Sequence, residues 1–149
     1  LTSSEKVEKT KKPAKRKSLK GIKVLLAEDN DLNAELAAIL LEDSEMIVTR
    51  AADGQEVVDL FANHPAGTYD IILMDIMMPK MDGLQAAKAI RAMQAERPDA
   101  EEIPIIALSA NAFAEDVQTS LDAGMNGHVS KPLNVAEVAK VIARNLNKS

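Results

Sequence analysis

The sequence predicts an α/β fold, a doubly wound three-layer structure in which a parallel five-stranded sheet is covered by helices on both faces. Short aliphatic runs alternate with amphipathic segments from residue 21 onwards. Several of the amphipathic segments open with Asp or Asn, which are residues that cap helix N-termini. Because right-handed crossovers place each helix over the sheet, five successive βα units imply helices on both faces.

The first 20 residues differ from the rest of the chain. They hold eight Lys and Arg, two Glu and few large apolar side chains. This composition is typical of a solvated, disordered linker. We therefore expect a basic linker over residues 1–20 and one acidic domain over residues 21–149. The chain begins at Leu1 rather than Met, which suggests a piece of a longer protein.

The predicted strands are short, and the first, third and fourth are nearly continuous apolar runs, as expected for strands buried on both faces. The five strands are Ile22–Ala27, Met46–Arg50, Asp70–Met74, Pro104–Leu108 and Gly127–Val129. Apolar residues at helical spacing predict helices through Leu32–Leu40 and Val57–Phe61, and over Gly83–Gln94, Ala112–Ala123 and Asn134–Asn145. The charged segment Gln94–Ile103 is predicted to be a solvated loop.

Composition excludes several classes of function. One Tyr, two Phe and no Trp leave almost no platforms for stacking bases, so direct binding of nucleic acid is not expected. The absence of cysteine excludes disulfides and thiolate metal sites and fits a reducing compartment. No apolar run approaches the ~20 residues that cross a bilayer, so we expect no membrane insertion by this segment and a cytoplasmic location.

Polar side chains follow four of the predicted strands. Glu28 and Asp29 follow the first strand, Asp75 follows the third, Ser109 the fourth and Lys131 the fifth. In a doubly wound sheet, ligands bind beyond the carboxyl ends of the strands. Carboxylates that converge there at ~4 Å repel by about 4 kcal/mol per pair at an effective dielectric of 20, so they need a counter-ion. Carboxylate oxygens suit Mg²⁺ or Mn²⁺.

A carboxylate beside a divalent ion, an ammonium group and a hydroxyl group suits phosphoryl transfer. That reaction depends on positioning and on electrostatic stabilisation of the phosphoryl oxygens. Asp is an established nucleophile that forms an aspartyl phosphate. The sequence holds neither a P-loop nor a glycine-rich nucleotide motif, so ATP is not the expected donor.

Four segments, VLLAEDN, ILMDIMMPKMDG, ALSA and SKP, resemble the receiver domain of response regulators and hybrid histidine kinases over roughly Ile22 to Leu146. The resemblance implies a flavodoxin-like (βα)5 fold with strand order 2-1-3-4-5. It implies that Asp75 is the phosphoryl acceptor and that Glu28 and Asp29 are the acidic pair that helps to hold the metal. Met77 matches the position whose main-chain carbonyl completes the metal shell.

The same resemblance assigns the remaining roles. Lys131 matches the lysine that pairs with the phosphoryl group, and Ser109 the hydroxyl that moves toward it on activation. Lys131-Pro132 matches a peptide bond usually found cis. His128 stands at a switch position that is usually aromatic, which puts a Phe-like or Tyr-like rotamer switch in doubt.

Simpler structural roles compete at several positions. Asp29 and Asp31 both suit a helix N-cap; we favour the metal role for Asp29 and the cap for Asp31. Gly83 follows Asp82 in a turn and is expected to allow a positive φ. His64 and His128 are expected to be surface or turn residues.

The resemblance implies a phosphohistidine donor, carried by a histidine kinase domain or by a histidine phosphotransfer protein. The chain most resembles the C-terminal receiver of a hybrid sensor histidine kinase, whose parent chain would be anchored in a membrane. A stand-alone response regulator is the alternative. Two other classes remain: a scaffold that is never phosphorylated, and a Mg²⁺-dependent phosphatase. Such phosphatases commonly need a second Asp two residues after the nucleophile, where this sequence has Met77.

Overall fold

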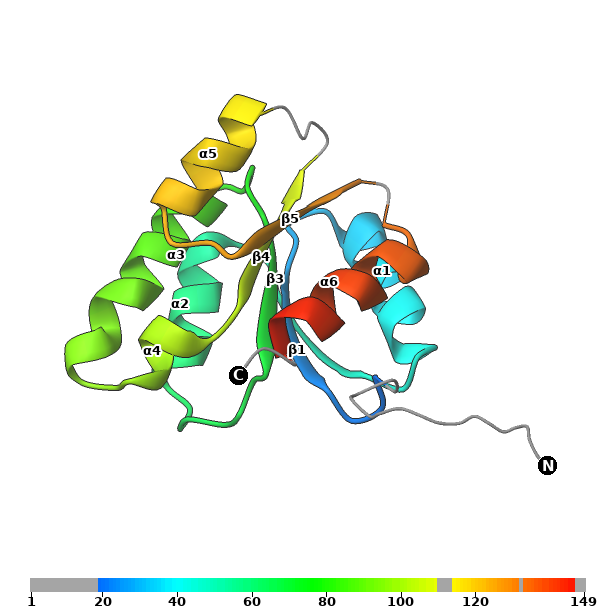
Figure 1. The fold of residues 1–149 in the computed structure, drawn as a ribbon, viewed down its shortest axis with the longest axis horizontal. Coiled ribbons are helices and arrows are strands. Elements are labelled where there is room, and N and C mark those ends of the chain that lie inside the picture. Colours follow the sequence, from blue (N-terminus) through cyan, green and yellow to red (C-terminus); the bar gives the residue numbers. More distant parts are fainter. Residues whose placement is uncertain (1–18, 110–113, 132, 147–149) are drawn as a thin grey trace.

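The computed structural model describes residues 19–109, 114–131 and 133–146 (Figure 1). Five parallel strands form one sheet in the order β2-β1-β3-β4-β5, as predicted. The strands are β1 Lys23–Ala27, β2 Ile47–Ala51, β3 Ile71–Asp75, β4 Ile105–Ser109 and β5 Gly127–Ser130. Each lies within one residue of its predicted bounds. Residues 1–18 of the expected linker, and Pro132 with its expected cis bond, lie outside the described residues.

The helices cover both faces of the sheet, as predicted (Figure 1). They are α1 Asp31–Glu42, α2 Gly54–Ala62, α3 Gly83–Arg91, the 3-10 helix η1 Ala92–Ala95, α4 Asp99–Glu102, α5 Ala114–Asp122 and α6 Val135–Leu146. Helix α3 is shorter than predicted because its last turn tightens into η1. No helix in the described part of the chain is long and apolar enough to cross a membrane.

Alternate side chains of the central strands pack into two separate hydrophobic cores, one on each face of the sheet, as the two-residue period of a strand requires. Leu26 and Leu73 pack with α1 and α6 on one face, where Leu41 and Ile142 are fully buried. On the other face the core includes Leu25, Ile72 and Met74 from the strands, with Val57 and Phe61 from α2 and Ile90 from α3. Leu19, from the expected linker, also packs into the first of these cores.

The prediction of a solvated loop over Gln94–Ile103 was wrong. The segment contains the end of η1 and the whole of α4, and Ala100 is fully buried. The Arg97 guanidinium lies 4.2 Å from the centre of the Phe61 ring, forms an ion pair with Asp99 at 2.9 Å and donates to the Phe61 carbonyl. A charged sequence is ordered here because arginine stacks on an aromatic ring and its fork matches a carboxylate.

Two local predictions at helix starts were also wrong. Asn30, not Asp31, caps α1: its side-chain oxygen accepts the Asn33 N–H at 2.9 Å. Gly83 has no positive φ and instead begins α3, which Asp82 caps in a capping box with Gln85. Glycine is required there for a different reason, because a Cβ atom at residue 83 would lie 2.4 Å from the Asp75 carbonyl oxygen.

Candidate functional site

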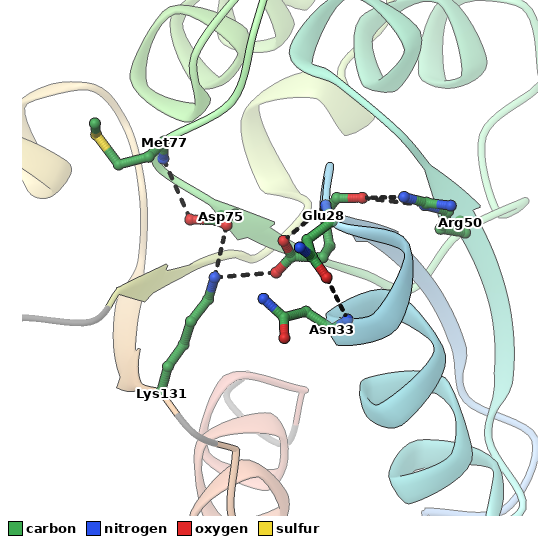
Figure 2. A network of polar contacts seen from close by, with 7 residues as sticks. Glu28, Asn33, Arg50, Asp75, Met77 and Lys131 are labelled. Carbon is green, nitrogen blue, oxygen red and sulfur yellow. Dashed lines mark hydrogen bonds and ion pairs between the residues drawn. The ribbon is translucent and has the colours of Figure 1, made fainter.

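Three carboxylates, those of Glu28, Asp29 and Asp75, meet at the carboxyl ends of β1 and β3, and Figure 2 shows two of them, Glu28 and Asp75. Asp75 ends β3 and is 6% exposed, and Glu28 follows β1 and is 3% exposed, whereas Asp29 is open to solvent. One oxygen from each of the three lies within 4.8 Å of the others. The structure therefore brings together the three carboxylates that the sequence placed at this edge. Burial of two negative charges demands a compensating cation.

Lys131 supplies that cation from the segment after β5. Its Nζ lies 2.6 Å from Asp75 Oδ2 and 3.0 Å from Glu28 Oε1. Burial alone would lower the pKa of Lys131, but the hydrogen bonds and negative charges of Asp75 and Glu28 outweigh this effect and raise the pKa. The ammonium group is therefore charged at neutral pH and bridges the two buried carboxylates.

Main-chain amides bind the remaining oxygens of the two buried carboxylates. The Met77 N–H donates to Asp75 Oδ1 and the Asn30 N–H donates to Glu28 Oε2, both at 3.2 Å. Each carboxylate thus has one charged and one main-chain partner, which fixes its plane. The Met77 side chain is 78% exposed and points away from Asp75 (Figure 2). No general acid stands at this position, two residues after Asp75.

The backbone on both sides of Asp75 is held by neighbouring segments. The close approach of Gly83 presses the start of α3 against the Asp75 carbonyl, and the Gly83 N–H donates to the Ile76 carbonyl at 2.8 Å. Asp75 is paired in register with Leu108 of β4. Asp75 therefore sits at the end of a paired strand rather than on a free loop.

Arg50 is a residue that the sequence reasoning missed. It stands near the end of β2, and its Nε and Nη2 donate to the Glu28 carbonyl at 3.0 and 2.8 Å (Figure 2). Its Nη1 forms an ion pair with Asp31 at 2.9 Å. The sequence signal for Arg50 was one positively charged residue near the end of an otherwise uncharged strand. Such a residue gives no indication that its partner is a main-chain carbonyl.

Ser109 and His128 stand on β4 and β5. Ser109 lies one residue beyond Leu108, so it reaches the same edge as Asp75, and its carbonyl accepts the Lys131 N–H at 2.8 Å. The expectation of a surface or turn position for His128 was wrong. His128 lies within β5, and both its ring nitrogens are buried without a hydrogen-bond partner among the described residues. His64 is exposed, as expected.

The acidic cluster suits a small divalent cation. Mg²⁺ binds oxygens at about 2.0–2.1 Å in octahedral geometry, which places its ligands roughly 3–4 Å apart. The three carboxylate oxygens, within 4.8 Å of one another, need only small shifts to reach that spacing. With one ammonium for three carboxylates, the cluster keeps a net negative charge that attracts a metal ion.

Comparison with known proteins decides the family. A model of the response regulator receiver domain matches residues 24–143. This chain is a receiver domain. It is 39% identical over 152 residues to the hybrid signal transduction histidine kinase B of Dictyostelium discoideum, and 37% identical over 122 residues to the sensor protein GacS of Pseudomonas syringae pv. syringae. The matches cover 97% and 82% of the chain but only 8% and 13% of those relatives.

Solved receiver domains share the fold. The receiver domain of the sensor histidine kinase PA1611 from Pseudomonas aeruginosa PAO1, which has a magnesium ion coordinated in its active-site cleft, is 36% identical with a TM-score of 0.75 over 86% of this chain and 99% of its own. The receiver domain of Ssk1 from Saccharomyces cerevisiae, crystallised with the histidine phosphotransfer protein Ypd1, is 28% identical with a TM-score of 0.77 over 87% of this chain and 92% of its own. The chain thus belongs to two-component signalling.

Proposed function

We propose that this receiver domain accepts a phosphoryl group on Asp75 from a phosphohistidine of a partner protein. One observation carries the proposal: the buried Asp75 carboxylate lies 2.6 Å from the Lys131 ammonium and within a cluster that includes Glu28 and Asp29. A nucleophile, a cation for the incoming oxygens and a set of metal ligands therefore share one edge of the sheet. A scaffold that is never phosphorylated would not need this arrangement.

The chemistry follows from these positions. One oxygen of Asp75 attacks phosphorus while the bond between phosphorus and the donor imidazole nitrogen breaks. The imidazole leaves with the bonding pair and takes up a proton, so the products are an aspartyl phosphate and a neutral histidine. Lys131 shifts from Asp75 to the phosphoryl oxygens, and the Ser109 hydroxyl donates to another of them. Positioning and charge stabilisation dominate, as in other phosphoryl transfers.

We assign the metal site to the carboxylates of Glu28, Asp29 and Asp75 together with the Met77 main-chain carbonyl, and Mg²⁺ or Mn²⁺ as its occupant. A bound ion would supply positive charge that offsets the carboxylates and the phosphoryl oxygens. The magnesium-bound PA1611 receiver domain, 36% identical, supports the choice of metal. The exposed carboxylate of Asp29 gives the ion an entry path from solvent.

An apolar surface beside the site indicates how the donor docks. Leu32, Leu36 and Ile39 of α1 are each more than half exposed and lie on one face of the helix. Next to them is a pocket of about 440 Å³, lined by Leu36, Leu40 and Leu133 together with Glu28 and Lys131. We propose that the helix carrying the phosphohistidine packs on this α1 surface, since exposed apolar patches mark interfaces. The Ypd1 complex of the Ssk1 receiver domain supports a histidine phosphotransfer protein as this partner.

We propose further that the receiver domain is part of a hybrid histidine kinase. Two of its relatives are a hybrid histidine kinase and a sensor protein, and it spans a small part of each. The absence of cysteine from the whole sequence fits a reducing compartment, and we propose the cytoplasm. The full-length gene tests the first point, since an upstream kinase core supports it and an immediate start codon supports a stand-alone regulator.

The direct test is phosphorylation by acetyl phosphate, followed by intact-mass analysis. Wild type should gain one phosphoryl group with Mg²⁺ and none after chelation, and Asp75→Ala should gain none. Asp31→Asn, which changes an exposed Asp outside the cluster, should be phosphorylated like wild type. Labelling of Asp75→Ala, or steady turnover of a phosphomonoester such as p-nitrophenyl phosphate, would overturn the proposal.

A further inference from the structure

Three hydrogen-bonding links attach the main chain of Glu28 to the edge strand β2. The Glu28 N–H donates to the Ala51 carbonyl at 3.0 Å, and the Glu28 carbonyl accepts two N–H groups from Arg50 at 3.0 and 2.8 Å. The main-chain N–H and the main-chain carbonyl of Glu28 therefore both form hydrogen bonds with residues of β2. The charged guanidinium makes the stronger attachment, because charge-assisted hydrogen bonds are roughly twice as strong as neutral ones.

The same guanidinium reaches the start of α1. Its Nη1 pairs with Asp31, so one planar group joins the first and last residues of the turn from Glu28 to Asp31. Two proposed metal ligands, Glu28 and Asp29, lie on this turn. The guanidinium touches the Glu28 carbonyl rather than its carboxylate, so Arg50 holds the ligand-bearing backbone without occupying the carboxylate oxygens.

We propose that Arg50 is a positioning residue for divalent-cation binding, which fixes the Glu28–Asp31 turn so that the two acidic side chains face Asp75. The inference rests on the proposed function of the site. Residues that orient metal ligands from outside the coordination shell typically contribute 10–100-fold to metal affinity.

Positioning and simple electrostatics predict opposite changes in Mg²⁺ affinity when Arg50 is replaced. Removal of a positive charge near three carboxylates would by itself tighten the binding of Mg²⁺. Loss of ligand positioning would weaken the binding. An increase in the dissociation constant when Arg50 is replaced therefore cannot come from the lost charge.

Isothermal titration calorimetry with Mg²⁺ alone tests the proposal on the whole chain. We expect Arg50→Ala to raise the dissociation constant about 10-fold. Arg50→Lys should also raise it, although its charge is unchanged, because an ammonium cannot reproduce the planar fork. Asp31→Asn, which weakens the ion pair with Arg50 but leaves both bonds to the Glu28 carbonyl, should raise it less than Arg50→Ala does. Without metal, the Glu28 and Asn30 amides should exchange faster with solvent in Arg50→Ala than in wild type.

Arg91 provides a matched control away from the site. Its guanidinium also binds main-chain carbonyls, those of Ala100, Ile103 and Gly124, at 2.7 to 3.0 Å. Arg91→Ala should lower the unfolding temperature while its Mg²⁺ affinity stays within twofold of wild type. Unchanged or tighter Mg²⁺ binding by folded Arg50→Ala would overturn the positioning role alone. Failure of wild type to bind Mg²⁺ or to become phosphorylated would instead overturn the proposed function.

Discussion

The two buried carboxylates and the partly buried His128 differ in how the burial of their polar atoms is compensated. Glu28 and Asp75 each have a charged partner and a main-chain donor, so their burial is compensated. The imidazole of His128 has neither, among the residues that the structure describes. A buried polar group without a hydrogen bond costs about 1–3 kcal/mol. His128 is therefore retained at a cost to the stability of this arrangement.

Replacement of His128 by Leu, a side chain of similar size, should raise the free energy of unfolding by about 1 kcal/mol, because two unpaired nitrogens disappear. Urea denaturation at pH 7 would measure the change. His64→Leu serves as the control, since His64 is exposed and its Nδ1 lies 2.7 Å from the Leu60 carbonyl oxygen. A His128→Leu variant less stable than wild type would show that the imidazole finds a partner in solution.

The residue-level assignments that the sequence allowed are those that depend on strand ends. Glu28, Asp75 and Lys131 were placed together because parallel strands deliver their carboxyl ends to one edge. Arg50 was missed because its partner is a carbonyl oxygen, which every residue has. Asn30 and Asp31 both suit a helix cap, and only the observed backbone shows that Asn30 takes the role.

At the scale of elements, α1 differs from the other described helices in how it presents apolar side chains. Leu32, Leu36 and Ile39 face solvent although Leu41 of the same helix is fully buried. The helix is therefore apolar on more than the face that packs on the sheet. Such a helix is incompletely covered in the isolated domain, which is what a partner interface requires.

The Leu36→Gln substitution should weaken phosphotransfer from a histidine phosphotransfer protein, with the dissociation constant of the complex rising about 10-fold, as for the loss of an interface hot spot. Phosphorylation by acetyl phosphate should persist, because no donor helix is needed. Ile47→Gln is the control, since Ile47 is equally exposed but begins β2, at the other end of the strands. Equal loss in both variants would argue against docking on α1.

Strand and helix positions were predictable wherever an apolar period continued through several residues. The segment from Gln94 to Ile103 was not, because its order depends on Phe61, more than 30 residues away, against which Arg97 stacks. Gly83 was singled out correctly but for the wrong reason. The residue types in a turn do not indicate that the start of a helix lies against the end of a strand, as it does at Gly83.

At the scale of the whole molecule, the fold concentrates negative charge at one edge of the sheet and compensates it with a single described ammonium group. On the proposed function, the native state binds a divalent cation that the unfolded chain cannot hold in the same way. Such binding stabilises the fold by an amount that grows with the logarithm of ligand concentration.

Mg²⁺ should accordingly raise the free energy of unfolding by about 2.7 kcal/mol at a concentration 100 times its dissociation constant. Thermal or urea unfolding in MgCl₂ and in NaCl of matched ionic strength would measure it. Asp29→Asn should lose most of the effect, and Asp31→Asn should keep it. Equal stabilisation by NaCl would mean that general screening, and not a site, is responsible.

The long sequence separation between Lys131 and its two carboxylate partners has a consequence for the growing polypeptide. Its ammonium group pairs with Asp75, which lies 56 residues earlier in the sequence, and with Glu28, which lies 103 residues earlier. Lys131 itself follows β5, the last strand of the sheet. A nascent chain that has emerged as far as β4 already carries Glu28, Asp29 and Asp75, yet it lacks the cation that compensates the buried Asp75. On the proposed function, an incomplete receiver therefore lacks part of its phosphoacceptor site until nearly the whole domain has been synthesised.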